Sequence, residues 1–179
     1  MDVMYMGTGI KIPKAKQPPT RRISEDNKKV LIIHDNRIKE FTEKAHKIGE
    51  IIDEMEGYEA VIDKDHWTPG EKTSDTETNN REKEMVKKSD IAYRFIPPSS
   101  ITKEERHDGS IREVRKVIKA SKPLVEHYYQ EAKDSPNRSL SEKNYKKREI
   151  IRTKKGEHIK RKIKETLDKA NKEHDKNAD

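Results

Sequence analysis

The sequence contains no cysteine, few aromatic residues and no long apolar run. Without cysteine the chain forms no disulfide and has no thiolate nucleophile. No segment approaches the roughly 18 consecutive apolar residues that a membrane-spanning helix needs. The first residues also lack the pattern of a secretory signal peptide. We therefore expect a cytoplasmic protein with no membrane partner.

Motifs that mark several ligand-binding classes are also missing. No glycine-rich phosphate loop and no G-x-G-x-x-G pattern follows the first apolar run, which argues against nucleoside-triphosphate and standard dinucleotide folds. Asp63, Asp65 and His66 could bind a metal, but no second motif completes a site at credible spacing. We favour an ordinary polar loop there, and we expect neither a metal nor an organic cofactor.

Charge is abundant, at 42% of the 179 residues, with a net charge of +7. Much of the excess lies near the ends, in "KIPKAKQPPTRR" and "KKREIIRTKKGEHIKRKIK". A basic balance favours polyanions such as nucleic acid or phosphorylated ligands. We favour a solubilising surface over a nucleic-acid site, because no zinc-finger, RNA-recognition or bZIP pattern supports the latter.

The apolar residues are concentrated in the middle of the chain. Residues 1–27 carry three prolines and no periodic pattern, which predicts a mobile basic arm. Residues 28–174 contain every apolar cluster and are expected to form a single domain. Residues 175–179 are expected to be a disordered tail.

Within this domain, strand patterns alternate with helix patterns. Val30–Ile33 is a short β-branched run typical of a strand buried on both faces. Further strands are expected over residues 58–63, 91–96 and 122–129 and, more weakly, 148–153. Apolar stripes at helical spacing run over residues 38–55, ended by Gly57, and over 81–90, 110–118 and 159–170, whereas the polar residues 66–80 predict a loop.

This alternation predicts an α/β fold with right-handed crossovers, a flavodoxin-like three-layer sandwich around a five-stranded parallel sheet of order 2-1-3-4-5. Ligands of such sheets bind beyond the carboxyl ends of the strands, where the order reverses between strands 1 and 3. The candidates there are His34, Asp35 and Asn36, then Ser99 and Ser100, and then Gly109, Ser110 and Glu113. His34 and Asp35 are either an acid–base pair or an ordinary strand end.

Ser110-Ile-Arg-Glu113 has the S-x-x-E form of a helix capping box. Such a cap contributes about 1 kcal/mol. The free amides of the same helix start, after Asp108-Gly109, could instead hold a phosphate or lower the pKa of a carboxyl group. The residue pattern alone favours the cap and leaves the second interpretation open.

The stretch "SDIAYRFIPPSSITKEERHDGSIREVRKVIKASKPLV" resembles the nucleoside 2-deoxyribosyltransferase-like family, which includes nucleoside 5′-monophosphate N-glycosidases. Ser89-Asp90 opens a strand, Asp108-Gly109-Ser110 begins a helix, and Ser121–Val125 matches a G-K-P-hydrophobic segment. The resemblance implies that Glu113 is the nucleophile and that Asp108 orients the sugar or assists the leaving base. Glu82 lies where members often have another acidic residue, and the resemblance implies that it binds the substrate.

The implied activity is cleavage of the N-glycosidic bond of a nucleoside or nucleotide, by hydrolysis or by transfer to another base. Ser99, Ser100 or Ser110 would bind a 5′-phosphate, and the family implies a homodimer or higher oligomer. Distantly similar TIR-type domains cleave NAD, so the substrate class stays open. Two other hypotheses are a catalytically inactive nucleotide- or protein-binding module on the same fold, and a basic nucleic-acid-binding protein.

Overall fold

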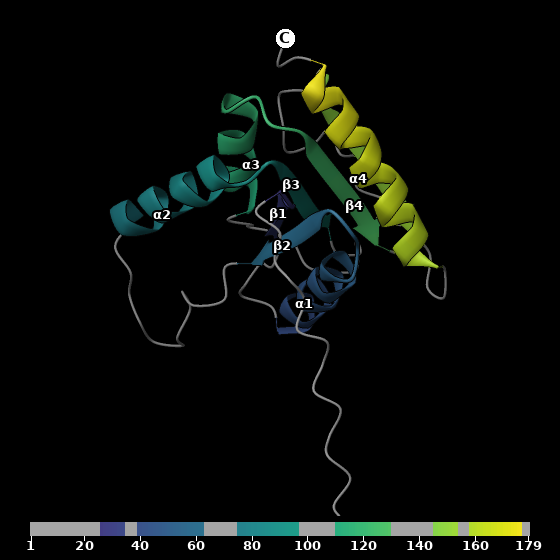
Figure 1. Ribbon diagram of the computed structural model, residues 1–179. Helices are drawn as coiled ribbons and strands as arrows, with labels where there is room; N and C mark the ends of the chain where they lie inside the picture. The colour runs from purple at the N-terminus through teal and green to yellow at the C-terminus, as the bar shows by residue number, and fades with distance from the viewer. Residues whose placement is uncertain are drawn as a thin grey trace, which may run out of the picture.

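The computed structural model describes residues 26–34, 39–62, 75–96, 110–129, 145–153 and 158–176. These residues form a five-stranded sheet of order β2-β1-β3-β4-β5, in which every pair of neighbouring strands is parallel. The predicted flavodoxin-like three-layer α/β sandwich is confirmed (Figure 1). The strands are β1 (Lys28–Ile33), β2 (Tyr58–Ile62), β3 (Ile91–Ile96), β4 (Leu124–Tyr129) and β5 (Arg148–Thr153).

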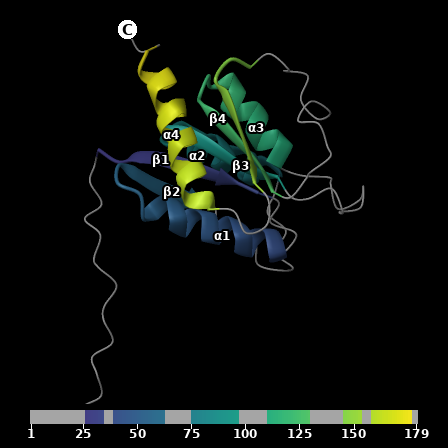
Figure 2. The same ribbon diagram turned by 90° about the vertical axis from the view of Figure 1, so that its right-hand side faces the viewer.

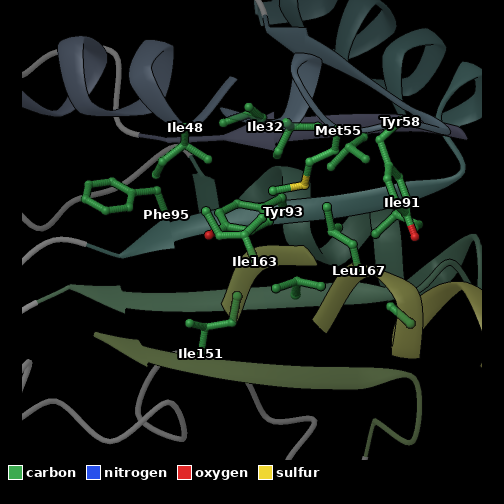
Figure 3. Close-up of a cluster of buried hydrophobic side chains, with 14 of the residues drawn as sticks. Ile32, Ile48, Met55, Tyr58, Ile91, Tyr93, Phe95, Ile151, Ile163 and Leu167 are labelled. Atoms are coloured by element: carbon green, nitrogen blue, oxygen red, sulfur yellow. The ribbon is translucent and has the colours of Figure 1, made fainter. Parts of the chain in front are cut away.

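One face of the sheet is covered by α1 (Lys39–Asp53) and α4 (Ile159–Asp175). Both helices have the apolar spacing expected from the sequence, and they pack on the larger of two apolar clusters. In Figure 2, α4 lies in front of the strands. Figure 3 shows Ile163 and Leu167 of α4 among the strand side chains of this cluster, near Tyr93. This face holds most of the apolar core.

The other face is covered by α2 (Asp75–Lys88) and α3 (Ser110–Lys119), which meet in a smaller apolar cluster (Figure 1). Alternation along β1, β2, β3 and β4 divides their apolar side chains between the two clusters. In β1, for example, Val30 and Ile32 belong to the larger cluster and Leu31 and Ile33 to the smaller one. A strand buried on both faces therefore has the unbroken apolar run seen in its sequence.

The predicted start of α2 is wrong. The sequence predicted a loop through Asn80, whereas the helix begins at Asp75. Its first six residues are all polar, so no apolar stripe marks them. The carboxylate of Glu77, in the first turn, favours a helix start because it lies near the positive end of the helix dipole.

Two tight turns mark the amino edge of the sheet. Gly57, with φ of 84°, precedes β2, and its carbonyl accepts from the amide of Lys28 at 2.8 Å. Ser121, with φ of 54°, ends α3 in a Schellman motif. In this motif the amide of Ser121 donates to the carbonyl of Ile118 at 2.9 Å, and that of Lys122 donates to the carbonyl of Val117 at 3.2 Å. Ser121 thus adopts a conformation that favours glycine.

The described helices include none that is long and apolar enough to cross a membrane. The predicted mobile arm over residues 1–27 lies almost wholly outside the described residues, as do the last three residues of the predicted tail. The domain limits of 28 and 174 therefore stay predictions.

Candidate functional site

The end of α3 shows which way the helix runs across the sheet. The Nζ atom of Lys122, just after α3, donates to the carbonyls of Lys87 and Ser89, which precede β3. The end of α3 is therefore at the amino edge of the sheet. Its ten residues span about 15 Å, so its first turn lies toward the carboxyl edge, where ligands of such folds bind.

Glu113 stands in this first turn and is half-buried. The helix begins at Ser110, as the S-x-x-E pattern predicted. A carboxylate in the first turn is stabilised by the positive end of the helix dipole. The position of Glu113, its partial burial and the field of the helix dipole are all compatible with a reactive carboxylate.

Most of the other predicted site residues belong to the segments that follow the strands. The structure describes His34, which is buried directly after β1. Six other predicted residues lie outside the described residues: Asp35, Asn36, Ser99, Ser100, Asp108 and Gly109. Asp63, Asp65 and His66, which were considered for a metal, also lie outside them.

Glu82, predicted from the family resemblance as a substrate-binding residue, faces α3 from α2. Its carboxylate accepts from both nitrogens of the Arg112 fork, at 2.7 Å and 3.1 Å, and from the ammonium of Lys116. Burial by itself raises the pKa of the Glu82 carboxyl, but hydrogen bonds from Arg112 and Lys116 outweigh it and hold that pKa below its usual range. The carboxylate is therefore charged and joins the two helices.

The sheet itself carries an ionic cluster on the face that α2 and α3 cover. Glu126 of β4 is fully buried between Arg94 of β3 and Arg148 of β5, whose side chains are each 7% exposed. Arg94 Nη1 lies 3.3 Å from Glu126 Oε2, and Arg148 Nε lies against Oε1. We call Arg94, Glu126 and Arg148 the ionic cluster. Two of its charges, Arg94 and Glu126, lie on strands that also contact α3, the helix of Glu113.

Tyr128 and Arg152 extend the ionic cluster toward the carboxyl edge. The Tyr128 hydroxyl donates to Glu126 at 3.5 Å, and the Arg152 guanidinium lies 4.9 Å from the centre of the Tyr128 ring. Burial, followed by the charge of Glu126, raises the pKa of Tyr128 to about 12. The tyrosine is therefore a neutral donor at physiological pH.

The ionic cluster of Arg94, Glu126 and Arg148 was not predicted from the sequence. One signal was available: a single charged residue interrupts each apolar run, in "IAYRFI" and in "LVEHYY". Recognising the pair also required the strand register, which sets Arg94 directly opposite Glu126. Register depends on tertiary packing.

A chain of neutral groups lies on the opposite face. His127 Nδ1 is 2.6 Å from the hydroxyl of Tyr93, and its Nε2 is 2.7 Å from the hydroxyl of Thr153. Burial, and then the charge of Lys162, lower the pKa of His127 to about 4. The imidazole is therefore neutral at physiological pH and links β3, β4 and β5.

Among the described residues, no group of three or more histidine, aspartate and glutamate side chains could hold a metal ion. The described site is thus defined by Glu113, by the Glu82 bridge beneath its helix and by the ionic cluster of the sheet.

Solved structures show which proteins share this fold. The chain is similar to a CMP N-glycosidase of Clostridium botulinum, BcmB, with a TM-score of 0.51 and 15% identity, over 76% of this chain and 98% of that one. It is also similar to a conserved protein of Enterococcus faecalis, with a TM-score of 0.53 and 11% identity, over 78% and 98% of the two chains. No protein-family model and no curated protein matches the sequence. The expected resemblance to nucleotide N-glycosidase-like proteins is confirmed at the level of the fold.

Proposed function

We propose that the protein is a nucleotide N-glycosidase-like or nucleoside 2-deoxyribosyltransferase-like enzyme that cleaves an N-glycosidic bond with Glu113 as nucleophile. The observation that carries this proposal is the place of Glu113. It lies in the first turn of the helix that connects β3 to β4, in a fold similar to that of a CMP N-glycosidase.

The reaction has two steps. The Glu113 carboxylate attacks the anomeric carbon of the sugar, and the C–N bond breaks with its electron pair passing to the base nitrogen. Asp108 gives a proton to that nitrogen. Water then attacks the anomeric carbon of the glycosyl ester and gives a proton to Asp108, which frees the sugar and restores the Glu113 carboxylate. A second base in place of water would make the reaction a transfer.

The other predicted residues have binding roles in this proposal. Ser99, Ser100 and Ser110 would bind a 5′-phosphate together with the amide of Gly109. His34, Asp35 and Asn36 would contact the nucleoside from the end of β1. We also propose a homodimer or higher oligomer in the cytoplasm; light scattering during size-exclusion chromatography tests the oligomer.

Incubation with nucleosides, nucleoside monophosphates and NAD, followed by chromatography of free base, tests the activity and identifies the substrate class. We expect Glu113→Gln to abolish base release, with a loss of at least about a thousandfold, because the amide is not nucleophilic. Glu165→Gln is the matched control, because Glu165 is exposed on α4 and pairs only loosely with Arg161, at 3.5 Å.

Base release that survives Glu113→Gln would remove Glu113 from the mechanism. A wild-type protein that releases no base from any of the three substrate classes would contradict the enzyme proposal. Tight nucleotide binding without base release, equal in wild type and Glu113→Gln, would instead establish an inactive binding module.

A further inference from the structure

Two cations of α3 stand close to Glu113 in the sequence. Arg112 precedes it, and Lys116 follows it by three residues. Residues three apart are neighbours on a helix surface, so an ammonium at position 116 can reach a carboxylate at position 113. Such a pair would lower the pKa of the carboxyl group and occupy its oxygen atoms. A nucleophilic carboxylate at position 113 needs that ammonium held elsewhere.

The structure holds both cations on the α2 side of the helix. The Glu82 carboxylate takes two hydrogen bonds from Arg112 and a third from Lys116, whose side chain is only 15% exposed. Glu82 itself is 8% exposed. A buried carboxylate that accepts three charge-assisted hydrogen bonds fixes its partners far better than an exposed pair does.

We propose that Glu82 is a positioning residue for Glu113: it binds Lys116 and Arg112 and thereby keeps the Lys116 ammonium away from the Glu113 carboxylate. This inference rests on the proposed function, in which Glu113 is the nucleophile. Glu82 contacts the substrate in none of its steps. Its role replaces the substrate-binding role that the family resemblance implied for this position.

Other charged and titratable groups also lie on the strands that α3 packs against. They include Arg94 of β3 and Glu126 and Tyr128 of β4. Arg94 is bound by Glu126. Comparing variants with and without Lys116 therefore isolates the contribution of its ammonium to the pKa of Glu113.

Glu82→Gln tests the proposal, because glutamine keeps the volume and loses the charge. We expect the acid limb of the pH profile of kcat/KM to move down by about half a pH unit, and kcat to fall roughly threefold with KM unchanged. Adding Lys116→Met should restore both quantities. Equal impairment of the single and double variants, with no movement of the pH profile, would reduce Glu82 to a purely structural contact between helices and overturn the proposal.

A readout that needs no turnover separates this inference from the proposed function. Carbon-13 NMR of glutamate-labelled protein, assigned with Glu113→Gln, gives the pKa of Glu113 directly. We expect that pKa to be lower in Glu82→Gln than in wild type, whether or not the protein releases base. An unchanged pKa would overturn the inference, whereas an inert wild-type protein with the expected pKa difference would overturn only the proposed function.

A second variant covers the case in which Glu82→Gln does not fold. Lys116→Met leaves Glu82 with Arg112 as its partner. The proposal predicts an unchanged Glu113 pKa in this variant, since the ammonium that it removes is already bound to Glu82. A rise of about half a pH unit would show that Lys116 contacts Glu113 in the wild-type protein, and would overturn the proposal.

Discussion

The two faces of the sheet solve the same problem, polar groups inside a core, in different ways. Under α1 and α4, His127 and its two hydroxyl partners are neutral and hydrogen-bonded within the larger apolar cluster. Under α2 and α3, the polar groups carry full charges, in the ionic cluster and in the Glu82 bridge. A buried charge costs several kcal/mol of desolvation, which a neutral chain avoids.

The face under α1 and α4 is therefore electrically neutral, whereas the fixed charges of the face under α2 and α3 also produce an electric field. Fixed charges in a region of low dielectric act strongly on a nearby reacting group. Both charged assemblies lie on the side of α3, which carries Glu113. Both faces contribute packing, and in our proposal the Glu82 bridge of the charged face also controls the charge around Glu113.

Glu126→Gln should produce the largest change in stability, because it leaves two buried guanidinium groups without their carboxylate. We expect the free energy of unfolding to fall by about 3–5 kcal/mol, measured by urea denaturation. Glu149→Gln is the control on the opposite face: its partner Lys169 is 63% exposed, and the loss should stay below about 1 kcal/mol. Equal losses in the two variants would remove the contrast between the faces.

Acid should lower the free energy of unfolding through His127, on the neutral face. His127 has a folded-state pKa of about 4, below the ordinary value of 6.5, so between these values the unfolded chain binds the proton that the folded chain excludes. His127 makes its full contribution to the free energy of unfolding above pH 6.5, and this contribution is lost as the pH falls toward 4. The loss is roughly 3 kcal/mol for a shift of this size.

His127→Gln isolates this effect, because glutamine offers a donor and an acceptor but does not titrate. The difference in unfolding free energy between wild type and variant, measured by urea denaturation at a series of pH values, should shrink as the pH falls from 6.5 to 4. A difference that stays constant over this range would show that His127 does not carry the acid sensitivity.

The smallest change is expected at the end of α3, on the amino edge shared by both faces. Ser121→Gly should raise the free energy of unfolding by about 0.5–1 kcal/mol, because glycine adopts a positive φ without the Cβ conflict. Thermal unfolding measures the gain. Gly57→Ala, at the other positive φ, should lower stability by a similar amount. A loss in Ser121→Gly would show that the serine is not strained.

Much of the fold could be predicted because its signals are local. The β-branched run of β1 and the apolar stripes of α1 and α4 each identify an element from a few neighbouring residues. The first six residues of α2 were not predicted, because they are all polar and no apolar stripe marks them. The site was only partly predictable: the start of α3 with Glu113 carried a capping pattern, whereas the ionic cluster joins three strands that are distant in the sequence.

The sequence by itself determined the alternation of strands and helices, and from it the parallel sheet. It also determined the start of the helix that carries Glu113 in its first turn, because hydrophobic period and helix-end chemistry are properties of adjacent residues. Only the tertiary structure decided that Glu82 binds Arg112 and Lys116 and that Glu126 lies between two arginines. Such pairings depend on strand register and helix docking, which bring together side chains some 30 residues apart or more, or 22 in the case of Arg148.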